Sequence, residues 1–254
     1  MQKRKPIPLV ILALLGSVLL VSSTPSVNAV AQVTILSHSG YTDSLGWYYI
    51  VGEVQNTGDM NLEYVEITAT FYDSSNVVVD TSFTFADLSV LLVDRKSPFK
   101  VILVDTEQSA KVDHYSLGVT YDVSEFGKPE GLEILSSSSY VDILGWMHVV
   151  GEIKNVGVYA TTYVEVIATV YDGTGKVIDC AFTFSNPSDL EADQKAPFEI
   201  MLMSDKVSLV DSYELTAESD QYAMIPEFSS VIILLLFMMA TLMAVIAHKG
   251  KHPM

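Results

Sequence analysis

The chain has 254 residues, which is enough for one or two domains at the usual size of roughly 100–200 residues each. Its formal net charge is −17 and its mean hydropathy is +0.34, although only 18% of its residues are charged, so its apolar residues are concentrated in discrete segments. Five of the 14 basic residues but only one of the 31 acidic residues lie near the ends, which leaves the middle with a formal charge of about −21. Such a surface repels nucleic acid and anionic headgroups, and we interpret it as a solubilising extracellular surface.

The N-terminus has the layout of a secretory signal peptide. Three basic residues at positions 3–5 precede an apolar run, Leu9 to Val21, that is too short to span a bilayer comfortably. Small residues follow this run, and they predict cleavage after Ala29 or after Ala31. An uncleaved signal anchor is the alternative.

The segment YVEITATFYD at residues 64–73 carries the clearest strand pattern of the next region. Its apolar residues Val65, Ile67, Ala69 and Phe71 alternate with polar ones, which predicts a strand with one buried face. The same alternation recurs over residues 99–103 and 115–119. Between the strands, residues 56–58 are expected to adopt positive φ and residues 73–76 to form a hairpin turn.

The sequence repeats itself with a period of 99 residues. The stretch LGWYYIVGEVQN at residues 45–56 returns as LGWMHVVGEIKN at residues 144–155, and the match extends without a gap from Val33 to about Val104. A period near one hundred residues has the size of a domain rather than of a solenoid repeat. Short alternating strands with turns between them predict an all-β fold of two tandem Ig-like antiparallel β-sandwich domains.

Both copies contain a G-E-[VI]-x-N-x-G segment, at residues 52–58 and 151–157, followed by a strand that ends in Tyr-Asp. These residues resemble the FxLYD domain, an Ig-like β-sandwich of exported prokaryotic proteins. Ala69 and Ala168 stand where the name-giving motif usually has Phe. The resemblance implies a sandwich fold and brings no catalytic residues with it.

The C-terminus combines a short motif with an apolar run. Pro226, Glu227 and Phe228 precede residues 231–247, which approach the roughly 20 apolar residues needed to cross a bilayer, and a basic tail follows. This layout resembles the PEF-CTERM sorting signal of archaeal surface proteins, which implies processing by an archaeosortase and transfer to an envelope lipid. An ordinary single-pass anchor is the alternative, and in both cases the run tethers the chain to the membrane.

We therefore expect seven segments along the chain: a signal peptide (1–31), a first β-domain (32–126), a linker (127–131), a second β-domain (132–219), a stalk (220–230), a transmembrane helix (231–247) and a cytoplasmic basic tail (248–254).

Few residues in the middle region suggest site chemistry. His38, His114 and His148 are not repeated between the copies and have no ligand spacing, so we expect surface or strand-face histidines. Ser37 is no nucleophile for His38, because neighbours on a strand point to opposite faces. Cys180 is the only cysteine, which excludes an internal disulfide; we expect a packing residue, with a reactive thiol as the alternative.

Calcium and sugars are the remaining ligands that the sequence suggests. Asp73, Asn76 and Asp172 offer oxygens in turns, although such side chains also bond to the backbone of their own turn, so we expect no cofactor. Trp47 and Trp146 are expected to fill the core, with stacking on a sugar as the alternative.

These features predict a non-catalytic, exported, membrane-anchored cell-surface protein whose bulk is extracellular. Its two modules would bind another envelope protein or act as a structural spacer, and it would bind no nucleic acid. A cation- or glycan-binding accessory is the second hypothesis, and a membrane-attached enzyme is the third.

Overall fold

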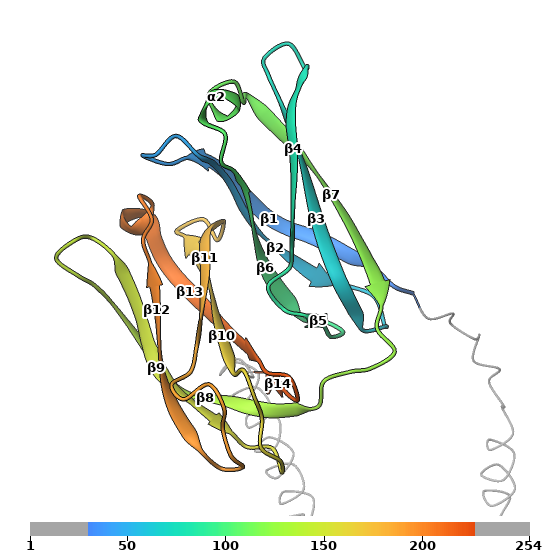
Figure 1. The fold of residues 1–254 in the computed structure, drawn as a ribbon, viewed down its shortest axis with the longest axis vertical. Coiled ribbons are helices and arrows are strands. Elements are labelled where there is room, and N and C mark those ends of the chain that lie inside the picture. Colours follow the sequence, from blue (N-terminus) through green and yellow to red (C-terminus); the bar gives the residue numbers. More distant parts are fainter. Residues whose placement is uncertain (1–29, 227–254) are drawn as a thin grey trace, which may run out of the picture. The chain divides into compact units, whose positions relative to one another are not determined.

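The computed structural model describes residues 30–226 of the chain (Figure 1). The predicted signal peptide as far as Ala29, and the predicted transmembrane helix and tail together with Glu227 and Phe228, lie outside the described residues. The described part is mostly β-strand, as predicted, with one short α-helix, α2 (Thr106–Ser109), and one short 3-10 helix (Val207–Leu209). No helix within it has the length and apolar character needed to cross a bilayer.

Repeat 1, the first copy of the sequence repeat, forms two antiparallel sheets. One has the order β1-β2-β6, and in the other β3 pairs with β4, β5 and β7. Their strands are β1 (Val33–Thr42), β2 (Tyr48–Asn56), β3 (Leu62–Tyr72), β4 (Val78–Phe85), β5 (Val90–Leu91), β6 (Lys96–Leu103) and β7 (His114–Val123).

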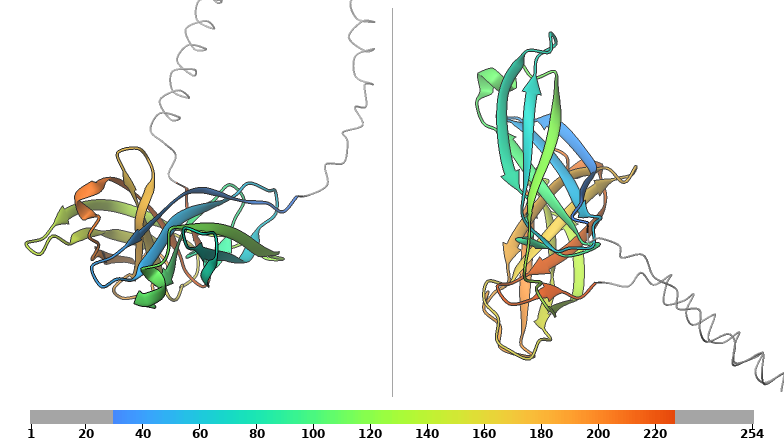
Figure 2. Two further views of the ribbon diagram at one scale, coloured as in Figure 1. Left: turned by 90° about the horizontal axis from the view of Figure 1, so that it is seen from above. Right: turned by 90° about the vertical axis from the view of Figure 1, so that its right-hand side faces the viewer.

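Repeat 2, the second copy, joins the corresponding strands into one sheet of order β11-β10-β13-β14-β8-β9-β12. Its strands are β8 (Glu130–Val141), β9 (Met147–Asn155), β10 (Glu165–Asp172), β11 (Val177–Phe184), β12 (Lys195–Leu202), β13 (Val210–Glu218) and β14 (Ala223–Met224). Figure 2 shows the strands of repeat 1, coloured blue to green, and those of repeat 2, coloured yellow to red, from two further sides.

Strand β14 is the main difference between the repeats. It runs antiparallel to β13 and parallel to β8, and so links two halves that stay separate in repeat 1. The Ala223 amide donates to the Pro129 carbonyl, and Tyr222 packs over Gly131. Strand β8 therefore begins at Glu130, within the expected linker, and β14 lies within the expected stalk.

The period-two pattern places the core where the sequence predicts it. In β3, Val65, Ile67, Ala69 and Phe71 are all buried, and the alternating residues of β6 face them across repeat 1. The matching positions of β10 and β12 build the core of repeat 2: Val164, Val166, Ala168, Val170, Phe198, Ile200 and Leu202. Each repeat thus has its own apolar core between strands of opposite layers.

The Gly of the G-E-[VI]-x-N-x-G segment is required by close packing. A Cβ atom on Gly52 would lie 2.5 Å from Cζ of Phe99 and 2.8 Å from the Ser37 carbonyl oxygen. Gly151 has the same relation to Phe198 in repeat 2. The Gly and the Phe of each repeat are therefore one packing unit.

The Asn of the same segment fixes the loop that follows it. The Asn56 side-chain amide donates to the carbonyls of Met60 (2.8 Å) and Leu91 (2.9 Å), and its oxygen accepts from the Gly58 amide (3.1 Å). Asn155 makes the corresponding three bonds in repeat 2. Neither Asn has positive φ, nor has the Gly two residues later, so that expectation is wrong: the Asn acts through its buried side chain.

We predict that Asn56→Ala lowers the free energy of unfolding by about 2–4 kcal/mol, because it leaves two carbonyl groups near the core without their donor. The neighbouring Gln55→Ala, which removes one exposed bond to the Asp94 carbonyl, should cost less than about 1 kcal/mol. Urea titration of the two variants measures the difference. Equal losses would show that the buried amide does not hold the loop.

Candidate functional site: the joint between the two repeats

A cluster of polar and charged side chains lies where the two repeats meet. Both repeats belong to one compact unit that begins at Ala31. Strands β10 and β11 of repeat 2 approach the outer face of β1, β2 and β6 of repeat 1. We call this contact the strand joint.

Apolar side chains occupy the centre of the strand joint. Val51, on the outer face of β2, and Val177, at the start of β11, are both fully buried and pack with Tyr171 and Tyr41. Ile167 of repeat 2 is also fully buried and packs with the core of repeat 1. Burial of this kind contributes roughly 1.5–3 kcal/mol for each aliphatic side chain.

Two serines of β1 bond to the backbone of β11. Ser39 Oγ donates to the Val177 carbonyl at 2.7 Å, and the Val177 amide donates to Ser37 Oγ at 3.2 Å. Since β11 is the end strand of its sheet, its backbone groups on that side have no strand partner. The two serines thus provide hydrogen-bond partners for the backbone amide and carbonyl of Val177, in place of a neighbouring strand.

Buried charges surround the apolar centre. Lys100 Nζ lies 2.7 Å from Asp179 Oδ1, whose side chain is only 7% exposed. Tyr171 OH donates to Glu53 Oε1 at 2.7 Å, and Lys96 lies 3.5 Å from the same carboxylate. Burial, with the Glu53 carboxylate beside it, raises the pKa of Tyr171, which keeps this hydroxyl a donor.

The charge of Lys100 is stabilised by its neighbours. Burial alone would lower the pKa of Lys100, but the Asp179 carboxylate 2.7 Å away more than compensates and raises it. Lys100 therefore stays protonated opposite Asp179. Cys180 itself is buried, and burial raises the pKa of its thiol well above the ordinary value, as expected of a packing residue.

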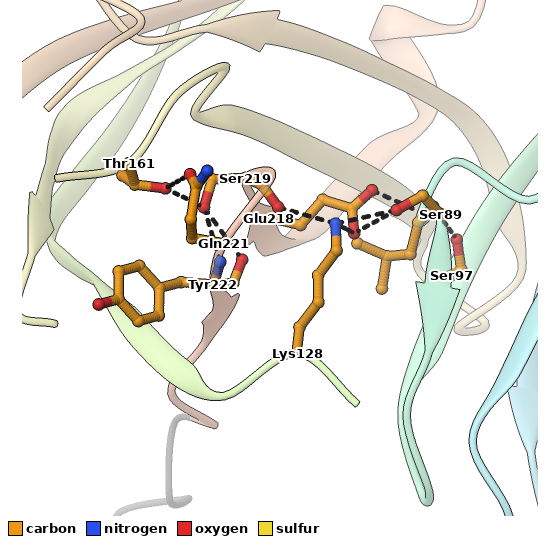
Figure 3. Close-up of polar contacts among 9 residues, drawn as sticks. Ser89, Ser97, Lys128, Thr161, Glu218, Ser219, Gln221 and Tyr222 are labelled. Carbon is orange, nitrogen blue, oxygen red and sulfur yellow. Dashed lines mark hydrogen bonds and ion pairs between the residues drawn. The ribbon is translucent and has the colours of Figure 1, made fainter. Parts of the chain in front are cut away.

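A second contact, the linker joint, lies around Lys128 (Figure 3). Lys128 Nζ lies 2.7 Å from Glu218 Oε2 and donates to the Ser219 carbonyl and to Ser89 Oγ of repeat 1. Glu218 also accepts from the Ser89 amide at 2.7 Å. One lysine of the linker thereby connects both repeats.

Beside the linker joint, two carboxyl groups have pKa values raised to about 7. Burial raises the pKa of Asp87 to about 7. Burial, followed by the nearby Glu218 and Asp87 carboxylates, raises the pKa of Glu165 to about 7. Arg95 of repeat 1 also contacts repeat 2: it donates a hydrogen bond to the Met224 carbonyl and lies 3.8 Å from Glu130.

The buried polar groups of the joint are all hydrogen-bonded. Within residues 30–226, every buried side-chain nitrogen and oxygen has a hydrogen-bond partner. Across the same residues, no three His, Cys, Asp or Glu side chains are placed to hold a metal ion. The arrangement is suited to fixing two bodies against each other.

Two of the predicted processing residues, Ala31 and Pro226, lie within the described chain. Ala31 packs against the core of repeat 1, and its carbonyl accepts from Tyr121 OH at 3.1 Å. Pro226 directly follows the residues that pair with β8. Ala29, Glu227 and Phe228 lie outside the described residues.

The candidate calcium ligands serve their own turns. Asp73 Oδ1 accepts from the Ser75 and Val77 amides, and Asp172 Oδ1 accepts from Thr174 and Lys176. The hydrogen bond from the Thr174 hydroxyl is the main reason that the pKa of Asp172 is lowered.

The three histidines have different surroundings. His38 lies 2.7 Å from Tyr115 OH, and His114 stacks on Tyr72. His148 is buried, stacks on Tyr140 and lies 2.8 Å from Glu199.

The expectation that the tryptophans fill the core is wrong. Trp47 and Trp146 are half-buried and do not belong to either core cluster. Each directly follows a turn glycine with positive φ, Gly46 or Gly145, and its backbone amide is bonded to the turn aspartate. Each Trp therefore lies at the end of a hairpin, outside the apolar core of its repeat.

The joint and two exposed aromatic pairs were not predicted from the sequence. Lys100 is replaced by Glu199 at the matching position of repeat 2, and a charge reversal within an otherwise similar strand was the available signal. Phe83 and Phe85 on β4, and Phe182 and Phe184 on β11, are all exposed with ring centroids 6.2 Å apart in each pair. The repeated Phe-Thr-Phe segments were visible, but their solvent exposure was not.

Comparison with known proteins gives one informative relative. No protein-family model matches the chain. An uncharacterized protein of Methanocaldococcus jannaschii, MJ0360, is 37% identical over 101 residues, which make up 39% of this chain and 72% of that protein. The aligned length is close to that of one repeat.

The solved structures found by comparison are similar to this chain only at low TM-scores, which do not indicate a shared fold. Red sea bream transglutaminase (9% identity, TM-score 0.26) and Amycolatopsis orientalis exo-chitosanase CsxA (10%, 0.27) cover 76% and 74% of this chain. The chain spans less than a third of the length of either protein.

We predict that Lys100→Met lowers the free energy of unfolding by about 2–4 kcal/mol, because Asp179 would stay buried without its partner. Lys154→Met is the matched control: it breaks a pair of similar length, 2.8 Å, whose partner Asp193 is 86% exposed, and should cost less than about 1 kcal/mol. Urea titration at pH 7 compares the two. If both variants lose the same amount, the strand joint does not depend on this pair.

We also predict that the protein becomes more stable as the pH falls from about 8 to about 5. Asp87 and Glu165 have folded-state pKa values of about 7, above their ordinary values of 3.8 and 4.5, so the folded state binds more protons between those limits. Their contribution is fully present below the ordinary pKa and is lost as the pH rises through about 7. Thermal unfolding of Glu165→Gln should show a shallower pH dependence, while the exposed Glu133→Gln keeps the native slope. An unchanged slope in Glu165→Gln would contradict this assignment.

Proposed function

Since the chain belongs to the same family as the uncharacterized protein MJ0360 of Methanocaldococcus jannaschii, we propose that it is a non-catalytic cell-surface protein built from two copies of that family's module. Its modules serve protein–protein interaction at the envelope or act as a structural spacer. The observation that carries this proposal is the joint, whose buried Lys100–Asp179 pair and Val51–Val177 contact fix one repeat against the other. A spacer or a docking platform needs such a defined geometry.

Each module, in this proposal, is an Ig-like β-sandwich of the FxLYD type; the first comprises β1 to β7 and the second β8 to β14. The separate core of each repeat and the packing of Gly52 on Phe99 and of Gly151 on Phe198 support it. The residues that resemble the family motif are thus accounted for by packing and loop closure. A structural motif repeated in this way is consistent with a scaffold.

The proposal includes export and attachment to the membrane. The N-terminal signal would be cleaved after Ala29 rather than after Ala31, because Ala31 packs on the core and accepts the Tyr121 bond. At the other end, Pro226-Glu227-Phe228 and residues 231–247 would act as a sorting signal of the PEF-CTERM type or as a simple anchor, with the bulk of the chain extracellular.

A glycan-binding accessory module is the second candidate function. The exposed pairs Phe83–Phe85 and Phe182–Phe184 favour it, because exposed aromatic rings provide stacking platforms. Calorimetry of the full chain with a glycan panel and with calcium separates it from the first. Absence of heat with every ligand would remove this candidate.

Intact-mass measurement of the protein isolated from native membranes tests the main proposal. We expect a chain that begins at Val30, and a C-terminus that is either complete or shortened near Phe228 with added lipid mass. Protease added to whole cells should remove the repeats. A full-length, protease-resistant chain in the cytosolic fraction would contradict the proposal.

A further inference from the structure

The strand joint uses one surface from each repeat, so the 99-residue repeat leaves a matching pair of surfaces unused. The free face is the counterpart, in repeat 2, of the surface on which β11 docks; it comprises the outward residues of β8, β9 and β12: Ser136, Ser138, Val150, Glu152 and Glu199. The free edge is the counterpart, in repeat 1, of the docking strand; it comprises Tyr72, Val78 and Asp80 of β3 and β4.

The free face repeats the geometry of the docked one. Val150 lies opposite Glu199 and Glu152 opposite Pro197 in the β9–β12 ladder. Val51 and Glu53 hold the same positions in the β2–β6 ladder. A groove of about 780 Å³ follows the free face between the serines of β8 and Glu199.

The exposed fractions show that this pair of surfaces lacks its partner within the described chain. Glu152 is exposed where Glu53 is only 4% exposed, and Ser136 and Ser138 are exposed. Val78 is 55% exposed, whereas Val177 at the matching position of β11 is fully buried.

Charge differs between the docked face and the free face. Lys100, which binds Asp179 in the strand joint, is replaced by Glu199, which lies 2.8 Å from His148 at the position of Tyr49. Asp179 is matched by Asp80 on the free edge. A second copy docked in the same way would bring Glu199 against Asp80, and like charges in a buried contact oppose association. A strand with a cation at that position would instead restore the ion pair.

We propose that the free face of β8, β9 and β12 docks an edge strand of another β-sandwich protein that carries Lys or Arg where β11 carries Asp179, and that Glu199 prevents copies of this chain from joining head to tail. The proposal rests on the interaction role proposed above and names its surface and the chemistry of its partner. The serines bind the backbone of the incoming strand, Val150 packs against its apolar residue, and Glu199 selects its charge.

The chain itself provides the probe. Asp80→Lys places a cation on the free edge opposite Glu199 of the next copy, and Glu199→Lys places one on the free face opposite Asp80. In sedimentation velocity of the full chain in a mild detergent, each single variant should self-associate at least about tenfold more tightly than the native chain. The double variant Asp80→Lys/Glu199→Lys again pairs like charges and should return to the native value.

Cross-linking tests the position of the contact. In the Asp80→Lys background, Val78→Cys in one tagged copy and Ser138→Cys in another should form a disulfide between copies, because Ser39 lies against Val177 in the strand joint. Asp211→Cys on β13, outside the free face, is the control and should not cross-link to Val78→Cys. Cys180 is buried and gives no background.

Two results would overturn the proposal. If both single variants sediment like the native chain and do not cross-link, the free face is not a docking site. If the native chain already associates and cross-links through these positions, its partner is a second copy and the charge argument is wrong. Neither result bears on export or membrane attachment, which the intact-mass measurement tests separately.

Discussion

The Lys100–Asp179 ion pair is the interaction on which the arrangement of the two repeats depends. Asp179 is almost fully removed from water, and a carboxylate there is tolerated only when a cation reaches it. Val51 and Val177 supply apolar burial beside it but would tolerate a displaced contact. The ion pair and the serine bonds to Val177 admit one register, since any displacement leaves a charge or a backbone group unpaired.

This constraint gives the duplicated chain a defined direction. The contact joins a face of one repeat to an edge of the other, so it is heterologous, and a heterologous contact repeats indefinitely unless something stops it. Within the described chain, the reversal from Lys100 to Glu199 distinguishes the free face from the docked one. The duplication therefore produced a two-module body and left one surface whose charge no longer matches the chain's own strand.

The strands and cores could be predicted from sequence because period-two alternation reports which side of a strand is apolar. Val65 to Phe71 and their counterparts in β10 lie where the pattern places them. The same pattern does not show whether an outward residue is covered by another part of the chain. Glu53 is polar and would be predicted to face solvent, yet it is buried beneath Tyr171. The joint was missed because it covers an outward face by tertiary contact. The tryptophans were misplaced because the turn glycines before them put each ring at the end of a hairpin.

Residual dipolar couplings of the backbone amides test most directly whether the joint makes the two repeats one body. The account predicts that a single alignment tensor fits the couplings of residues 33–123 and 130–224 together, in the relative orientation that the Lys100–Asp179 contact imposes. Two different tensors, one for each repeat, would show that the repeats reorient independently and would contradict the account.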